Sequence, residues 1–177
     1  MIAGSRSFFP RSFGKTLTRV FRPSRQRTRI SPPPPTSRAP LSPAPPGDFR
    51  GHPRIEYDPH PDGLPDPGEI VWTWVPFEET PEQGKDRPVL LIGRDGDRLL
   101  GLMLTSKDHD RDPAREARHG RSWYDIGTGA WDASRRPSEV RLDRVLRVDP
   151  AAVRREGAVL DARTFAEIAD RVRQVRG

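Results

Sequence analysis

The chain has 177 residues, with 31 Lys and Arg against 25 Asp and Glu for a formal net charge of +6, and it contains no cysteine. The absence of cysteine excludes disulfide frameworks, thiolate zinc sites and cysteine nucleophiles. No apolar run approaches the roughly 20 residues that a membrane-spanning helix needs, so we expect no membrane partner.

Charge and proline are distributed unevenly. Residues 1–47 hold nine basic side chains and no acidic one, so the rest of the chain carries a formal net charge of −3. Fifteen of the 21 prolines lie in residues 1–67. Residues 1–47 could be a disordered arm, a targeting peptide or an over-long start; the lack of apolar periodicity after Phe21 favours a disordered basic, Pro-rich arm. We expect an irregular Pro-rich linker over 48–67 and a folded domain over 68–177.

Three strands are predicted at the start of this domain. Residues 69–75 are β-branched and aromatic, with Pro76 ending the run, and both faces of that strand are apolar enough to be covered. A polar, turn-prone stretch over 78–86 separates it from a second strand at 89–92. An Asp-Gly turn then leads to a third strand at 99–104, which predicts an antiparallel meander.

The second half of the domain alternates polar loops with short apolar runs. Residues 105–120 predict a long loop with one helical turn over 114–118. A short strand is predicted at 123–126, and the alternation over 139–148 predicts two short strands or one bent strand.

Two helices are predicted near the C-terminus. Asp149 and Pro150 supply an N-cap and a first-turn proline for a short helix through Arg155. A second helix begins at Asp161, and its apolar residues recur at helical spacing: Phe165, Ile168, Val172 and Val175. Its basic outer side is expected to be solvated, with RNA or partner binding as the alternative: Arg163, Arg171, Arg173 and Arg176. Five or six short strands with one terminal helix predict a mainly β fold, a small antiparallel barrel.

An acidic loop raises the question of metal binding. Asp108, Asp110 and Asp112 occupy the first, third and fifth positions of a calcium-loop pattern. The sixth position, which needs Gly, is Pro113, and the twelfth, which needs Glu, is His119. The pattern therefore fails at the positions that shape the loop, and we expect no metal and no cofactor.

Two further catalytic patterns are weak. Ser106, His109 and an Asp could form a hydrolase triad, but the strand–turn–helix elbow that presents such a serine is missing. The sequence Gly127-Thr128-Gly129 lacks both the third glycine and the βαβ setting of a dinucleotide site.

A more specific signal lies where the second strand starts and the third ends. In a meander these two points are neighbours, which would bring Arg87 beside Thr105, with Lys85 and Lys107 close by. All of these side chains can donate hydrogen bonds and none is a carboxylate, which can only accept them, so the cluster suits a bound phosphate. The alternative is that Arg87 pairs with a neighbouring carboxylate, Asp86 or Asp108, and only stabilises the hairpin.

These same residues carry a resemblance to a known family. Gly68 to Trp72 matches a Gly-Glu/Asp-Ile/Val-Val-Trp strand, and residues 83–92 match a Gln-Gly-x-x-Arg-Pro-Val-Leu-x-Ile segment. Thr105 and Ser106 follow the third strand as in that family, and residues 144–149 match its later strand. Residues 68–175 thus resemble the PemK/MazF family of toxin endoribonucleases from bacterial toxin–antitoxin pairs.

The resemblance implies an SH3-like barrel, usually a homodimer, that cuts single-stranded RNA without metal and is neutralised by an antitoxin protein in the cytoplasm. The positions of Arg87 and Thr105 carry catalysis in that family. The expected RNA-binding residues surround this pair: Gln83, Gly84, Lys85, Ser106 and Lys107. Arginine is a poor proton acceptor, so a base for the 2′-hydroxyl is also needed unless positioning alone suffices. His109 is a local candidate because an unperturbed imidazole titrates near 6.5; the alternative is a solvated loop histidine.

A second function stays open. The net charge of −3 on the part of the chain able to fold does not favour holding a polyanion. A noncatalytic barrel of the same family, binding nucleic acid or a protein partner, is therefore the alternative to an endoribonuclease.

Overall fold

The structure is a computed structural model, and it describes residues 47–60, 62–109 and 113–177. The predicted disordered arm lies outside the described residues except at Gly47, and so do Asp110 and Asp112 of the calcium-like pattern. Within the described part of the chain, no helix is both long and apolar enough to cross a bilayer.

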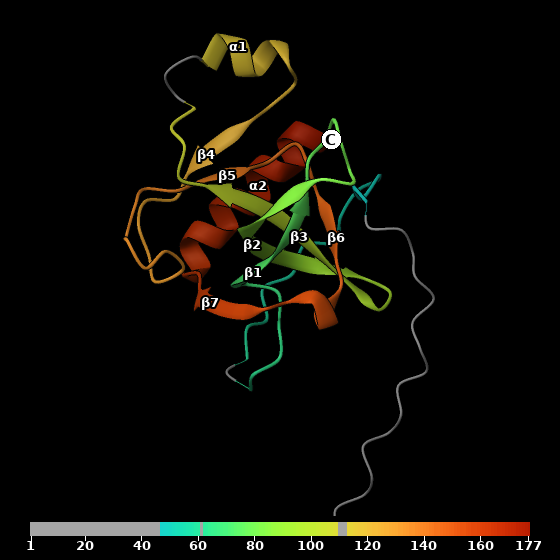
Figure 1. Cartoon of the computed structure of the whole chain (residues 1–177), viewed down its shortest axis with the longest axis vertical. Helices are drawn as coiled ribbons and strands as arrows, with labels where there is room; N and C mark the ends of the chain where they lie inside the picture. The colour runs from blue at the N-terminus through green and yellow to red at the C-terminus, as the bar shows by residue number, and fades with distance from the viewer. Residues whose placement is uncertain (1–46, 61, 110–112) are drawn as a thin grey trace, which may run out of the picture. The chain divides into compact units, whose positions relative to one another are not determined.

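An antiparallel meander forms the centre of the fold (Figure 1), as the sequence predicts. Its strands are β1 (Glu69–Pro76), β2 (Gly84–Asp95) and β3 (Arg98–Thr105). The predicted end of the turn at Asp86 is wrong. Strand β2 already begins at Gly84, which pairs with Pro76 of β1. A side chain at Gly84 would clash with the Val75 carbonyl and lie 2.8 Å from the Trp74 indole, so β2 can approach β1 here only as glycine.

Four short strands extend the meander into a curled antiparallel sheet, a half-barrel. They are β4 (Trp123–Asp125), β5 (Glu139–Arg141), β6 (Leu146–Val148) and β7 (Arg155–Val159). The order is β4-β5-β3-β2-β1-β7, while β6 pairs with the start of β3 and β5 with its end. The prediction of two short strands over 139–148 is confirmed, and the predicted fold class holds, with one more strand than the five or six expected.

The extra strand replaces part of a predicted helix. Asp149 caps a single 3₁₀ turn, η1 (Pro150–Ala152), by accepting a hydrogen bond from the Ala151 amide. The helix predicted through Arg155 is wrong, because the chain turns extended at Val153 and residues from Arg155 onward pair with the free edge of β1. The predicted helical turn in the long loop is present as α1 (Pro113–Arg118).

The C-terminal helix, α2 (Ala162–Arg176), begins at its predicted N-cap, because the Asp161 carboxylate accepts a hydrogen bond from the Thr164 amide. The basic outer side is solvated at Arg163 and Arg173, which pair with acidic residues of the same helix. Arg176 departs from that expectation, because its guanidinium donates to the backbone carbonyls of Asp143 and Phe49.

Both faces of the sheet are buried, so β1 is covered on two sides as expected. One face packs under α2 around Ile70, Leu90 and Ile168. The opposite face holds a second cluster that includes Val71, Val89, Met103 and Val148. Trp74 is an exception to the expected burial, since 48% of its surface is exposed.

Residues 47–58, here called the strap, run along the domain ahead of β1. Isolated bridges join Asp48 to Leu146 and Ile55 to Gly93, and a side chain at Gly93 would clash with the Arg54 carbonyl. The Tyr57 hydroxyl donates to the Leu160 carbonyl at 2.8 Å. The strap is therefore attached to the sheet at both ends without forming a named strand.

Candidate active site

Polar side chains from three adjacent strands lie in one row at the end of the meander. Val89 of β2 faces Met103 of β3, and the same antiparallel register continued by two residues sets Arg87 opposite Thr105. Thr105 in turn faces Glu139 of β5. Residues directly opposite each other project from the same face of a sheet. The row therefore lies on the face that α2 does not cover.

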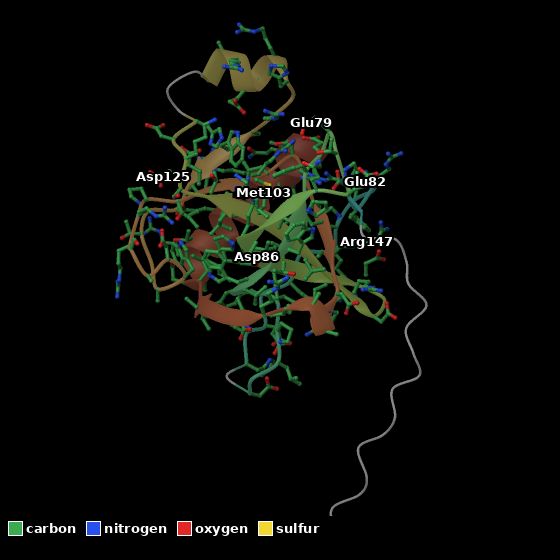
Figure 2. All side chains as sticks on the ribbon, viewed as in Figure 1. Glu79, Glu82, Asp86, Met103, Asp125 and Arg147 are labelled. Atoms are coloured by element: carbon green, nitrogen blue, oxygen red, sulfur yellow. The ribbon has the colours of Figure 1, made fainter. Side chains whose placement is uncertain are left out.

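A cavity of about 200 Å³ opens at this row. Val75 and Met103, from the second apolar cluster, line it together with Arg87 and Thr105. Figure 2 labels two of the lining residues, Met103 on β3 and Glu79 on the β1–β2 loop. The remaining charged or titratable lining of the cavity comes from five other segments of the domain: Glu78, Lys107, His109, Arg121, Arg141 and Arg144. The lining of the cavity thus combines buried apolar side chains with charged ones, of which Arg141 and Arg144 are themselves buried.

Arg87 is half-buried and forms no ion pair with any carboxylate that the structure describes. Its sequence neighbour Asp86 pairs instead with Arg154 at 2.8 Å, so the hairpin ion pair weighed from the sequence is not made with Asp86. Burial, and then the nearby charge of Arg144, lower the pKa of the Arg87 guanidinium from its ordinary value. A desolvated cation of this kind favours an anion that would replace its lost hydration.

The other arginines that line the cavity each form an ion pair with a carboxylate. Arg141 pairs with Asp143 at 2.8 Å and with Glu78 at 3.0 Å. Arg144 pairs with Asp48 of the strap at 2.8 Å. Arg121 likewise pairs with Glu79. Consequently the positive charge left unpaired among the described residues at this cavity belongs to Arg87 and to the exposed Lys107.

The Thr105 hydroxyl is oriented by its own loop. Its Oγ1 accepts a hydrogen bond from the Lys107 amide at 3.1 Å. Because a hydroxyl has a single proton, which this bond does not use, Thr105 can still donate toward a group bound in the cavity. Arg87 and Thr105 also line a second, smaller cavity of about 140 Å³, in which Ser106 takes part.

His109 is held firmly rather than solvated. Its Nδ1 lies 2.9 Å from Oε2 of Glu139, and its backbone amide donates to Oε1 of the same carboxylate at 3.0 Å. The ring stacks on Trp123, with centroids 3.9 Å apart and planes 5° from parallel. Both His109 and Glu139 side chains are 11% exposed. The sequence did not point to Glu139, because in the sequence it is only the first residue of a stretch that alternates like a strand.

The predicted RNA-binding residues divide into two groups. Lys107 lines the larger cavity and Ser106 the smaller one. Gln83 and Lys85 are exposed at the start of β2, and neither lines a described cavity. Gly84 between them has a packing role beneath Trp74.

Among the residues that the structure describes, the other chemical patterns considered from the sequence are not assembled. Asp108 and His119 are exposed, and the described residues contain no group of three His, Asp or Glu side chains that could hold a metal ion. Ser106 and His109 line different cavities, and the carboxylate beside His109 is Glu139 rather than an aspartate.

The chain was compared with known protein families, curated proteins and solved structures. No curated protein matches the chain. Among solved structures, it is similar to a chain of the crystal structure of MazE–MazF (form II) from Deinococcus radiodurans, at 19% identity and a TM-score of 0.45, covering 64% of this chain and 96% of that one. A family model described as the PemK-like, MazF-like toxin of type II toxin–antitoxin systems matches residues 66–176. Since this match spans more than half of the sequence, the chain belongs to the PemK-like, MazF-like toxin family.

Proposed function

We propose that the protein is a metal-independent endoribonuclease that cleaves single-stranded RNA by attack of a 2′-hydroxyl on the adjacent phosphorus. The observation that carries this proposal is the half-buried Arg87 guanidinium, which has no described carboxylate partner and lies across the β2–β3 ladder from the Thr105 hydroxyl. The cavity that both residues line suits a phosphodiester with its two nonbridging oxygens.

The chemistry follows from where charge develops. As the 2′-oxygen approaches phosphorus, negative charge grows on the nonbridging oxygens. Arg87 offers two parallel N–H donors to those oxygens and remains protonated at any working pH. The Thr105 hydroxyl donates a further hydrogen bond and helps to hold the phosphate in line. Donors fixed in place before the reaction stabilise such charge without reorganising.

His109 would act as the base in this reaction. It takes the 2′-hydroxyl proton while the 2′-oxygen forms its bond to phosphorus and the bond from phosphorus to the 5′-oxygen breaks. The leaving 5′-oxygen takes a proton from water, and the imidazolium later returns its proton to solvent. The products are a 2′,3′-cyclic phosphate end and a 5′-hydroxyl end.

The remaining polar residues of the region would bind the RNA strand. Lys107 lines the larger cavity and Ser106 the smaller one, where each would lie close to the bound phosphate. Gln83, Gly84 and Lys85 lie where the β1–β2 loop returns into β2 and would contact the backbone further along. Membership of a toxin family of type II toxin–antitoxin systems supports three further proposals: a homodimer, neutralisation by a cognate antitoxin protein, and action in the cytoplasm.

Cleavage of a mixed single-stranded RNA, with and without EDTA, tests the proposal. We expect EDTA-resistant cuts that fall by at least about a hundredfold in Arg87→Ala, the loss typical of removing one transition-state donor. Arg163→Ala is the matched control, because Arg163 is 90% exposed on α2, which packs against the other face of the sheet. Cuts that survive in Arg87→Ala, or that vanish with EDTA, contradict the proposal.

A noncatalytic barrel that binds nucleic acid or a protein partner is the alternative. It is favoured by the two carboxylates at the cavity, Glu78 and Glu79, and by the net charge of −3 outside residues 1–47. Salt-sensitive RNA binding without any cuts would support this alternative over the enzyme.

A further inference from the structure

We propose that Glu139 is a positioning residue that fixes His109 as the Nδ1–H tautomer, so that Nε2 is left free to accept the 2′-hydroxyl proton. This inference rests on the proposed function, because it concerns the base of that reaction. The observation behind it is the pair of contacts that the Glu139 carboxylate makes with His109.

The Glu139 carboxylate holds His109 at two points. One oxygen accepts from the His109 backbone amide at 3.0 Å, and the other lies 2.9 Å from Nδ1 of the ring. An ionised carboxylate can only accept hydrogen bonds, so the ring nitrogen facing it must carry the proton. A neutral imidazole has one N–H, and the lone pair is then on Nε2. Glu139 therefore determines both the orientation of the ring and its tautomer.

Trp123 fixes the plane of the ring. The indole stacks on the imidazole at 3.9 Å, and its Nε1 donates to Glu116 of α1 at 3.1 Å. Trp123 itself pairs with Arg141 in the β4–β5 ladder. Because His109 is clamped between a carboxylate and an indole, its loop position does not leave the ring free to rotate.

The strand register connects this unit to the phosphate site. Glu139 is the direct cross-strand partner of Thr105, so the carboxylate that orients the base stands next to the hydroxyl proposed to hold the phosphate. His109, Thr105 and Arg87 line the same cavity. The charged groups that face or share this cavity with His109 come from several elements and bear on any pH dependence: Glu78, Glu79, Arg87, Lys107, Glu116, Arg121, Glu139, Arg141 and Arg144.

Glu139→Gln tests the role with little change of shape. The glutamine amide can turn its NH₂ toward Nδ1 while its oxygen keeps the bond from the His109 amide. Nδ1 then becomes the acceptor, the proton moves to Nε2, and the base is lost. We expect cleavage to slow by about 10²–10⁴-fold, the range of general base catalysis. His109→Ala should cost the same, and the double variant should lose no more, because the two residues act as a unit.

The direct readout is the pair of ¹⁵N chemical shifts of the His109 ring in the full chain, which does not depend on activity. We expect an Nδ1–H tautomer in the wild type and an Nε2–H tautomer in Glu139→Gln. The acidic limb of the pH–rate profile should disappear in Glu139→Gln and in His109→Ala. His119→Ala is the matched control, since His119 is exposed and should leave rate and profile unchanged.

The outcomes of these experiments distinguish the positioning role of Glu139 from the proposed endoribonuclease activity. An Nε2–H tautomer in the wild type, or an imidazolium across the whole active pH range, overturns the inference. An unchanged rate and pH profile in Glu139→Gln, with the wild type still cutting RNA, refutes the positioning role alone and leaves the endoribonuclease standing. An Nδ1–H tautomer in a wild type that cuts no RNA refutes the proposed function, and the positioning role with it.

Discussion

Replacing Arg141 by alanine should be among the most destabilising single changes at the cavity. Its side chain is only 6% exposed, and it donates to Asp143 through Nε and Nη2 and to Glu78 through Nη1. Burial lowers the pKa of Arg141, but the hydrogen bonds with Asp143 and Glu78 outweigh burial and hold the pKa above its ordinary value. The guanidinium therefore fastens β5 to the β1–β2 loop.

The magnitude depends on what the two carboxylates meet once the guanidinium is gone. Breaking a buried ion pair by removing one partner costs about 3–5 kcal/mol. Glu78 is partly exposed and can regain water, whereas Asp143 is mostly buried and keeps the Ser122 amide, 2.8 Å away, as a hydrogen-bond donor. We therefore expect a loss at the lower end, about 3 kcal/mol.

Urea unfolding followed by tryptophan fluorescence measures this free energy. Arg163→Ala, which removes an exposed ion pair on α2, should cost far less than Arg141→Ala, because water screens exposed pairs. Arg141→Met restores the aliphatic packing but leaves Asp143 unpaired, so it should recover only part of the loss. If Arg141→Ala costs no more than Arg163→Ala, or if Arg141→Met is as stable as the wild type, the guanidinium does not stabilise the domain through these two carboxylates.

Three further experiments test the Thr105 hydroxyl, the Glu78–Arg141 hydrogen bond and the close packing at Gly84. Thr105→Val should keep the fold and lower cleavage by about 10²–10³-fold, while Thr105→Ser should retain most activity, as single-turnover rates would show. The hydrogen bond with Arg141 lowers the pKa of Glu78, although burial opposes this shift. The ionised Glu78 carboxylate therefore stabilises the folded state at pH values above its unfolded-state pKa, and this contribution is lost as the pH falls through the lower folded-state pKa. Urea midpoints between about pH 3 and 7 should show this loss in the wild type and a smaller one in Glu78→Gln. Gly84→Ala should lower the melting temperature, because the new methyl group would clash with the Val75 carbonyl; an unchanged melting temperature would contradict the close packing of β1 and β2.

Local patterns predicted the central strands and the last helix. The spacing of Phe165, Ile168 and Val172 is enough to fix the buried side of α2, and Asp161 fixes its start. The Asp-Gly turn between two apolar runs likewise fixes the β2–β3 hairpin, which is what brings Arg87 opposite Thr105. These features depend on residues that are close in sequence, so a single chain reveals them.

Features that depend on distant partners were missed. β7 is polar at its start and became a strand only because the edge of β1 was free to pair with it. Glu139 looks like an ordinary strand residue, and its role exists only because a loop brings His109 back against it. The ion pair between Arg144 and Asp48 could not be predicted either, because the two residues lie far apart in the sequence.

The most direct test of the account uses an RNA whose ribose at the cleaved position carries hydrogen in place of the 2′-hydroxyl. If Arg87 holds the phosphate and the 2′-oxygen is the nucleophile, this RNA will bind the wild type and stay intact. Its binding should weaken in Arg87→Ala and not in Arg163→Ala. Cutting of the 2′-deoxy RNA at the same bond, or binding that does not depend on Arg87, would contradict the account.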